Sequence, residues 1–127
     1  MNRLVNVVFA VCVAVVPASV AGQEKTIADG VFTEAQVEAG KGVYDSTCSA
    51  CHRMNEYRNV LRAFQGNSVM NLWELILGTM PADNPGSLAD SEYTNIIAFI
   101  LSDQGFPAGD TELDPYSNME DIKIVAP

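Results

Sequence analysis

Apolar residues recur every three or four positions in three stretches of the chain, which is the spacing of one face of an α-helix. The first stretch opens with a capping box formed by Thr33 and Gln36, so a helix is predicted to begin near Glu34. Gly40 and Tyr44 then lie on one stripe of this helix. A glycine inside a helix costs about 1 kcal/mol relative to alanine. Gly40 therefore indicates that another backbone crosses closely there, unless the helix merely tolerates it.

The other two stretches predict a second and a third helix. The second is predicted to end at Gly78 and Pro81, and the third to begin at Asp90 or Ser91 and to end at Gly105. No convincing strand pattern accompanies them, so the chain is predicted to be all-α with three or more helices. The two apolar faces consist of Val69, Leu72, Trp73, Ile76 and Leu77, and of Tyr93, Ile96, Ile97, Ile100 and Leu101.

Two segments lack helical periodicity. Residues 79–88 contain Pro81, Pro85 and Gly86, which predicts a rigid loop presenting Met80. From about residue 108 the chain is acidic and mostly polar, which predicts an irregular strap over the domain, with disorder as the alternative. The residues that would anchor such a strap are Leu113, Tyr116, Met119, Ile122 and Ile124.

Residues 1–21 have the pattern of a secretory signal peptide: Arg3, then a predominantly apolar run over residues 4–16, then small residues. The run is shorter than the roughly 20 apolar residues of a membrane-spanning helix. A retained anchor or a lipid on Cys12 is the alternative. We predict cleavage after residue 21, a periplasmic location without a membrane anchor, and a mature chain of residues 22–127, which is enough for one small domain.

The charge balance excludes some partners. The chain has 7 Lys and Arg residues against 16 Asp and Glu residues, and its formal net charge is −9. Nucleic acid and anionic membrane surfaces are therefore not expected partners. The acidic surface favours a protein with a positive patch, bound by an association that weakens with salt.

The most specific chemistry lies in Cys48-Ser49-Ala50-Cys51-His52. This is the spacing of a c-type haem attachment site, in which two thiols form thioethers with one haem and the adjacent imidazole reaches the iron. A dithiol redox centre would usually follow a strand in a βαβ unit, and a structural zinc site would normally need a fourth ligand. We predict one covalent haem c, held by Cys48 and Cys51, with His52 as the proximal iron ligand.

The stretch from Gly40 to Leu101 resembles the class I monohaem cytochromes c. The resemblance implies a small cytochrome c fold wrapped around the haem, in which Phe99 or Tyr93 packs against the first helix. It also implies a sulfur ligand from the loop before the last helix, which is the place of Met80. The residues that match the family's first helix and haem site are Gly40, Tyr44, Cys48, Cys51 and His52.

Elimination also favours Met80 as the distal iron ligand. His52 is the only histidine, so the chain cannot supply a second imidazole. Met54 is too close to His52 to reach the other face of a porphyrin, Met70 lies on a core-forming helix face, and Met119 lies in the tail. An open sixth position, a different methionine, or a Met80 that only fills a gap are the alternatives.

Four further side chains are candidate haem contacts: Trp73 and the arginines Arg53, Arg58 and Arg62, whose guanidinium groups could pair with haem propionates. The alternative for the arginines is a solvated helix face, since Arg58 and Arg62 lie one turn apart. Many relatives carry a proline-containing loop whose carbonyl orients the proximal histidine. The segment after His52 lacks it, so the partner of this ring is unassigned.

Histidine and methionine ligation raises the haem potential and favours electron transfer over oxygen chemistry. We predict an electron carrier, not an enzyme, between a dehydrogenase and an acceptor such as a terminal oxidase. The loop around Met80 and the sequence Phe106-Pro107-Ala108-Gly109 are similar to haem domains that accept electrons from quinoprotein dehydrogenases. The alternatives are a haem enzyme or gas sensor with an open sixth position, and a permanent haem subunit of a dehydrogenase complex.

Overall fold

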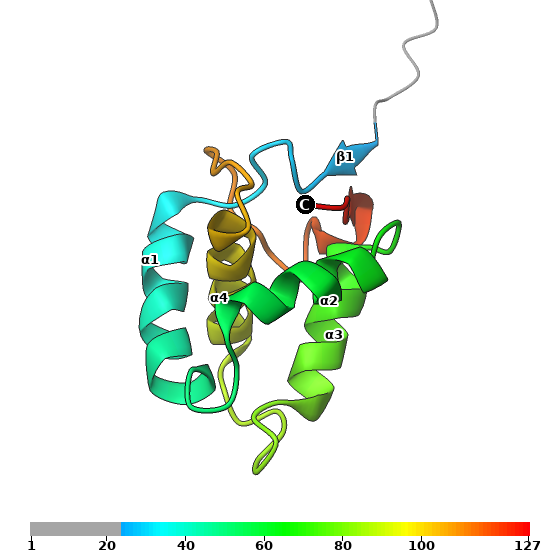
Figure 1. The fold of residues 1–127 in the computed structure, drawn as a ribbon. Coiled ribbons are helices and arrows are strands. Elements are labelled where there is room, and N and C mark those ends of the chain that lie inside the picture. The colour runs from blue at the N-terminus through cyan, green and yellow to red at the C-terminus, as the bar shows by residue number, and fades with distance from the viewer. Residues whose placement is uncertain (1–23) are drawn as a thin grey trace, which may run out of the picture.

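The structure, a computed structural model, describes residues 24–127, and the predicted signal peptide with Cys12 lies outside them. Four α-helices account for most of the regular structure, which confirms the predicted all-α fold class. In Figure 1, α1 and α4 lie side by side, while α3 stands on the other side of the molecule. The helices are α1 (Glu34–Val43), α2 (Tyr57–Ala63), α3 (Val69–Thr79) and α4 (Asp90–Asp103).

Three short helical turns and two short strands complete the fold. A π-helical turn over Tyr44–Cys48 continues α1, and 3-10 turns cover Met54–Glu56 and Met119–Asp121. Strands β1 (Lys25–Thr26) and β2 (Ile122–Lys123) pair in parallel, so the two ends of the described chain meet (Figure 1). Within residues 24–127, no helix has both the length and the apolar character needed to cross a membrane.

Helix α1 begins as predicted, and it packs closely on α4. The Thr33 side chain accepts a hydrogen bond from the Gln36 amide at 3.3 Å, and the Gln36 side chain accepts one from the Thr33 amide at 3.2 Å. A Cβ atom at Gly40 would lie only 1.8 Å from the carbonyl oxygen of Asn95 on α4. The prediction of a close backbone crossing at Gly40 is therefore confirmed.

The aromatic contact between α4 and the π-helical turn that continues α1 is made by Phe99. Its ring centroid lies 5.4 Å from that of Tyr44. Tyr93, the other residue considered for this contact, lies one and a half turns earlier on α4, and its hydroxyl bonds to the loop before that helix. Of the two residues that the resemblance offered, Phe99 therefore makes the aromatic contact. Tyr93 contacts the loop before α4 instead.

One helix boundary differs from the sequence prediction, and one helix was not predicted. Helix α3 does not end at Gly78 but continues to Thr79, because a single glycine can be tolerated near the last turn, where the Met80 amide still donates to the Ile76 carbonyl at 2.8 Å. Helix α2 was not predicted, since its seven residues are too few to show a periodic apolar face.

Residues 108–127 form an ordered C-terminal strap. Leu113, Met119, Ile122 and Ile124 are all buried, as predicted for anchors. Tyr116 is not an anchor: its side chain is 78% exposed, and its hydroxyl bonds to the Asp90 carboxylate at the start of α4. The apolar side chains on this segment stabilise it against disorder because they are removed from water.

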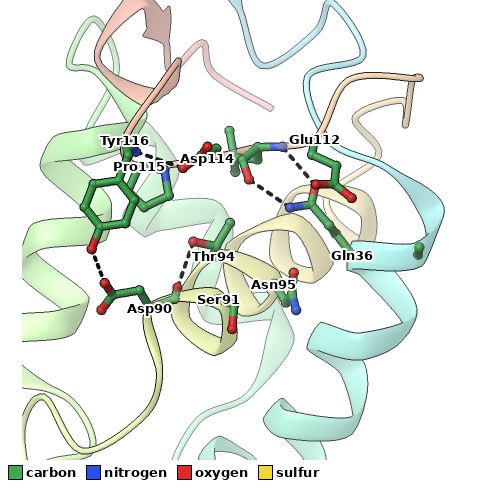
Figure 2. A pocket seen from close by; sticks show the side chains of 11 residues that line it. Gln36, Asp90, Ser91, Thr94, Asn95, Glu112, Asp114, Pro115 and Tyr116 are labelled. Carbon is green, nitrogen blue, oxygen red and sulfur yellow. Dashed lines mark hydrogen bonds between the residues drawn. The ribbon is translucent and has the colours of Figure 1, made fainter.

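The strap is also joined to α1 through a buried amide. The Gln36 side-chain nitrogen donates to the Leu113 carbonyl at 2.8 Å, and the Gln36 side-chain oxygen accepts from the Leu113 amide at 2.9 Å. Figure 2 shows these bonds in a pocket that also contains Tyr116 and Asp90. The same glutamine therefore completes the capping box of α1 and fixes the strap.

Candidate functional site

An apolar cavity brings the predicted site residues together. Its volume is about 760 Å³, within the roughly 300–1,000 Å³ range of ligand and cofactor sites. Both thiols of the Cys48–His52 motif, the His52 imidazole and Met80 line it. The apolar walls come from α2, α3 and α4, chiefly from Leu61, Leu72, Ile76, Ile96 and Ile100.

A change in helical pitch carries the cysteine motif into the cavity wall. After α1 the chain widens into a π-helical turn, in which the Ser49 amide bonds to the Tyr44 carbonyl at 3.0 Å. The chain then tightens, because the amides of Cys51 and His52 both bond to the Cys48 carbonyl, at 3.1 Å and 2.9 Å. Single π-helical turns are frequent at functional sites. Here the turn is followed at once by the segment that places Cys48, Cys51 and His52 in the cavity lining.

Tyr44 holds the backbone of His52 in place. Its hydroxyl donates to the His52 carbonyl at 2.8 Å, and its ring packs between Phe99 and Tyr57, with centroid distances of 5.4 Å and 6.1 Å. Burial raises the pKa values of Tyr44 and Tyr57 above that of a free tyrosine. Both phenols therefore stay protonated around neutral pH, and Tyr44 remains a hydrogen-bond donor.

The charged group beside the His52 ring is the Glu56 carboxylate. Its Oε2 atom lies 4.0 Å from Nδ1 of His52, beyond hydrogen-bond distance, and also accepts a bond from the Arg53 amide at 3.4 Å. Sequence reasoning left the partner of His52 unassigned and did not select Glu56. The signal available was its spacing of four residues from His52. A negative charge this close to the ring can make the imidazole a stronger electron donor.

The Cys48 thiol does not have the character of a reactive cysteine. Burial raises the pKa of the Cys48 thiol, whereas catalytic cysteines have lowered pKa values. The motif follows a helix, not a strand. Across residues 24–127 no group of three or more His, Cys, Asp or Glu side chains converges in a way that could hold a metal ion, and a structural zinc site would need four ligands.

Met80 is the one methionine among residues 24–127 that lines the cavity. It follows the last residue of α3, and its carbonyl accepts a hydrogen bond from the Tyr93 hydroxyl at 2.7 Å. Met54 and Met70 lie outside the cavity lining, and Met119 is a fully buried anchor of the strap. A thioether and an imidazole from distant parts of the sequence thus reach one apolar space.

Residues 35–100 match a protein family described as cytochrome C oxidase, cbb3-type, subunit III, and the match covers just over half of the chain. The chain belongs to this family of c-type cytochromes. No curated protein and no solved structure shows significant similarity to the chain. Family membership establishes a c-type cytochrome domain, implies haem c, and gives the chain a haem-based role in electron transfer.

The residues of this cytochrome fit the implied cofactor. Two thiols in haem-attachment spacing, an adjacent imidazole and a thioether face one apolar cavity. Haem is a flat, largely apolar group, so the aliphatic walls suit it. Cys48, Cys51, His52 and Met80 are therefore the side chains that would hold it.

The remaining predicted haem contacts do not line the cavity. Trp73 is buried in the core, between cavity-lining residues of α3, and its indole Nε1 is the one buried side-chain polar atom of residues 24–127 that has no hydrogen-bond partner. Arg53, Arg58 and Arg62 are exposed, and none of them forms an ion pair with a described residue. Their contacts with the haem stay predictions.

A second pocket, of about 560 Å³, lies under the strap and differs in chemistry (Figure 2). Its lining includes the carboxylates of Asp90, Glu112 and Asp114 and the ring of Tyr116. None of the predicted haem-site residues faces it. The candidate haem site is therefore the larger, apolar cavity.

Proposed function

We propose that this cytochrome is a class I monohaem electron carrier. In this proposal Cys48 and Cys51 hold one haem covalently, His52 is the proximal iron ligand and Met80 is the distal one. The observation that carries the proposal is that all four side chains line one apolar cavity. Histidine and methionine ligation is typical of cytochromes c whose haem transfers electrons.

Haem, when bound, supplies one-electron redox chemistry. The chain supplies its environment. Leu61, Leu72 and Ile96 keep water from the site, and Tyr44 fixes the backbone from which the His52 ring projects. The cavity lining also includes Cys51, which is exposed, and Leu75, which is 47% exposed. The site therefore reaches the protein surface, as electron exchange with a partner protein requires.

We propose a periplasmic location and a soluble shuttle role. The signal-peptide pattern of residues 1–21 supports export, and the net negative charge supports a partner with a positive surface patch. The donor in this proposal is a dehydrogenase, for which the resemblance to acceptors of quinoprotein dehydrogenases is the support. The acceptor is a terminal oxidase or another downstream protein.

One observation favours a second candidate function. The matched family is described as a subunit of an oxidase, which favours a haem domain held permanently in a complex. Stable co-purification with an oxidase or a dehydrogenase would support this candidate, and a monomer that exchanges electrons by collision would support the shuttle. A haem enzyme or gas sensor would need an open sixth position, and the place of Met80 in the cavity argues against it.

The decisive experiment starts from protein made in cells with an active haem-attachment system. Mass spectrometry should show the chain without residues 1–21 and with the mass of one haem added, and the Cys48→Ala, Cys51→Ala double variant should lack that mass. Cell fractionation of the same culture should place the protein in the periplasm. A wild-type chain without added mass would overturn the covalent assignment.

Met80 is tested by spectroscopy of the same preparation. The ferric wild type should show a sulfur-to-iron charge-transfer band in the far red, and the ferrous form should bind carbon monoxide slowly. Met80→Ala should lose the band and bind carbon monoxide rapidly. Met70→Leu is the matched control, because Met70 lies outside the cavity lining, and it should keep the wild-type spectrum. Loss of the band in Met70→Leu alone would contradict the assignment of Met80.

A further inference from the structure

The loop that carries Met80 is closed by one buried hydroxyl group. Tyr93, in the first turn of α4, is only 1% exposed. Its hydroxyl donates to the Met80 carbonyl at 2.7 Å and accepts from the Leu88 amide at 3.4 Å. Met80 and Leu88 stand at the two ends of the loop between α3 and α4. A single side chain therefore ties both ends of the loop to α4.

The remaining contacts of the Met80 backbone are local. Its amide donates to the Ile76 carbonyl at 2.8 Å, which ends α3, and its carbonyl accepts a longer bond, of 3.3 Å, from the Gly86 amide. The bond from Tyr93 is thus the shorter of the two to this carbonyl, and the only one of them that comes from a helix. Most of the intervening loop, residues 82–87, is exposed. The hydrogen bond from Tyr93 is therefore the one that ties the Met80 carbonyl to a packed helix.

Tyr93 also takes part in the cavity wall. Its ring lines the same space as Met80, together with Ile96 and Ile100 from the next turns of α4. Helix α4 is in turn held against α1 at Gly40. The Tyr93 hydroxyl therefore links the Met80 backbone to the closely packed helices α1 and α4.

We propose that Tyr93 is the positioning residue for Met80. Its hydroxyl fixes the Met80 carbonyl and so keeps the thioether within reach of the iron, which limits how often an external ligand can replace it. This inference rests on the ligand role of Met80 proposed above. Without the hydroxyl the aromatic ring still fills its place in the wall, but the loop opens more often and the sixth position is exposed more of the time.

The test uses the haem-loaded, full-length mature protein and imidazole as the external ligand. Replacement of Met80 by imidazole is followed in the ferric state by loss of the far-red charge-transfer band. Tyr93→Phe should raise the rate of replacement about two- to tenfold, as expected when one hydrogen bond is lost from the ligated state. The band itself should be present before imidazole is added, because the thioether is unchanged.

Tyr116→Phe is the matched control. Tyr116 also donates a hydrogen bond to the first turn of α4, at Asp90, but it does not line the cavity and has no hydrogen bond to the Met80 loop. Removal of the Tyr116 hydroxyl should leave the rate at which imidazole replaces Met80 unchanged. Equal acceleration in both variants would show that any loosening of α4 is sufficient, and an unchanged rate in Tyr93→Phe would show that the hydroxyl does not hold the loop. Either result overturns the proposal.

A wild-type measurement keeps the proposal testable if Tyr93→Phe does not fold. The Leu88 and Gly86 amides donate at the junction with Tyr93 and Met80, so their hydrogen exchange should be slow relative to an unprotected loop amide. Fast exchange at both would overturn the proposal. A wild type without the far-red band would overturn Met80 ligation itself, so the two failures are told apart by the spectrum of the unmodified protein.

Discussion

The hydroxyl of Tyr44 donates a hydrogen bond to the carbonyl of His52, with 2.8 Å between the two oxygens. We predict that Tyr44→Phe lowers the free energy of unfolding of the haem-loaded protein by about 1 kcal/mol, because the ring still packs on Phe99 and one hydrogen bond is lost. Denaturant titration measures the change. Tyr116→Phe, which alters an exposed residue, should have a smaller effect, and equal losses would contradict a special role for Tyr44.

The crossing of α1 and α4 predicts opposite effects at two glycines of one helix. Gly40→Ala should destabilise the protein strongly, by about 2 kcal/mol or more, since its Cβ atom would overlap the Asn95 carbonyl and force the helices apart. A Cβ atom at Gly42 meets no atom within 4 Å, so Gly42→Ala should stabilise α1 by up to about 1 kcal/mol. Thermal unfolding of both variants measures the difference. Similar midpoints would show that the helices can separate at little cost.

The Glu56 carboxylate should tune the reduction potential. It lies 4.0 Å from Nδ1 of His52. In the proposed ligation by His52, a negative charge near this ring stabilises the oxidised iron more than the reduced iron. Glu56→Gln should therefore raise the potential, which a redox titration measures. Glu38→Gln removes the same charge from the exposed face of α1 and should change the potential less. An equal rise in both would indicate an effect of net charge alone.

The buried strap should contribute substantially to stability. Ile122 is 1% exposed and belongs to β2, so Ile122→Ala should cost about 2–5 kcal/mol through lost burial and the cavity left behind. Thr111→Ala, at an exposed strap position, should stay within about 0.5 kcal/mol of the wild type. Denaturant unfolding separates the two variants. A small loss for Ile122→Ala would mean that the strap detaches without affecting the rest of the domain.

Electron uptake should depend on salt. The chain has 16 acidic and 7 basic side chains, so attraction to a positively charged protein donor should be screened as ionic strength rises. We expect slower reduction by the physiological donor at high salt in stopped-flow measurements. Reduction by a small uncharged reductant is the control and should not change. A flat profile with the protein donor would exclude electrostatic steering.

Helices α1, α3 and α4 could be predicted, and the cysteine motif could be recognised, because their signals are local. The Thr33 and Gln36 capping box marks the start of α1, and the Cys48–His52 motif places three groups within five residues. The loop after α3 is likewise marked by its prolines and glycine. Each of these features depends on residues that are close together in the chain, so the local pattern of residue types is enough to predict it.

The contacts that position the site have no such local signature. The bond from Tyr93 to Met80 joins residues 13 positions apart, and the one from Gln36 to Leu113 joins residues 77 apart. A buried tyrosine on an apolar helix face gives no indication of which carbonyl its hydroxyl will reach. Tyr116 shows the converse, because its aromatic character suggested an anchor, yet the strap leaves it in solvent.

The parallel pairing of β1 with β2 joins the beginning of the domain to its end. Lys25 lies opposite Ile122 and Thr26 opposite Lys123. Strand β1 therefore pairs with a segment that lies almost a hundred residues further along the chain. This pairing can form only when nearly all of the domain is present, so a chain truncated before residue 122 should leave β1 unpaired and open to proteases.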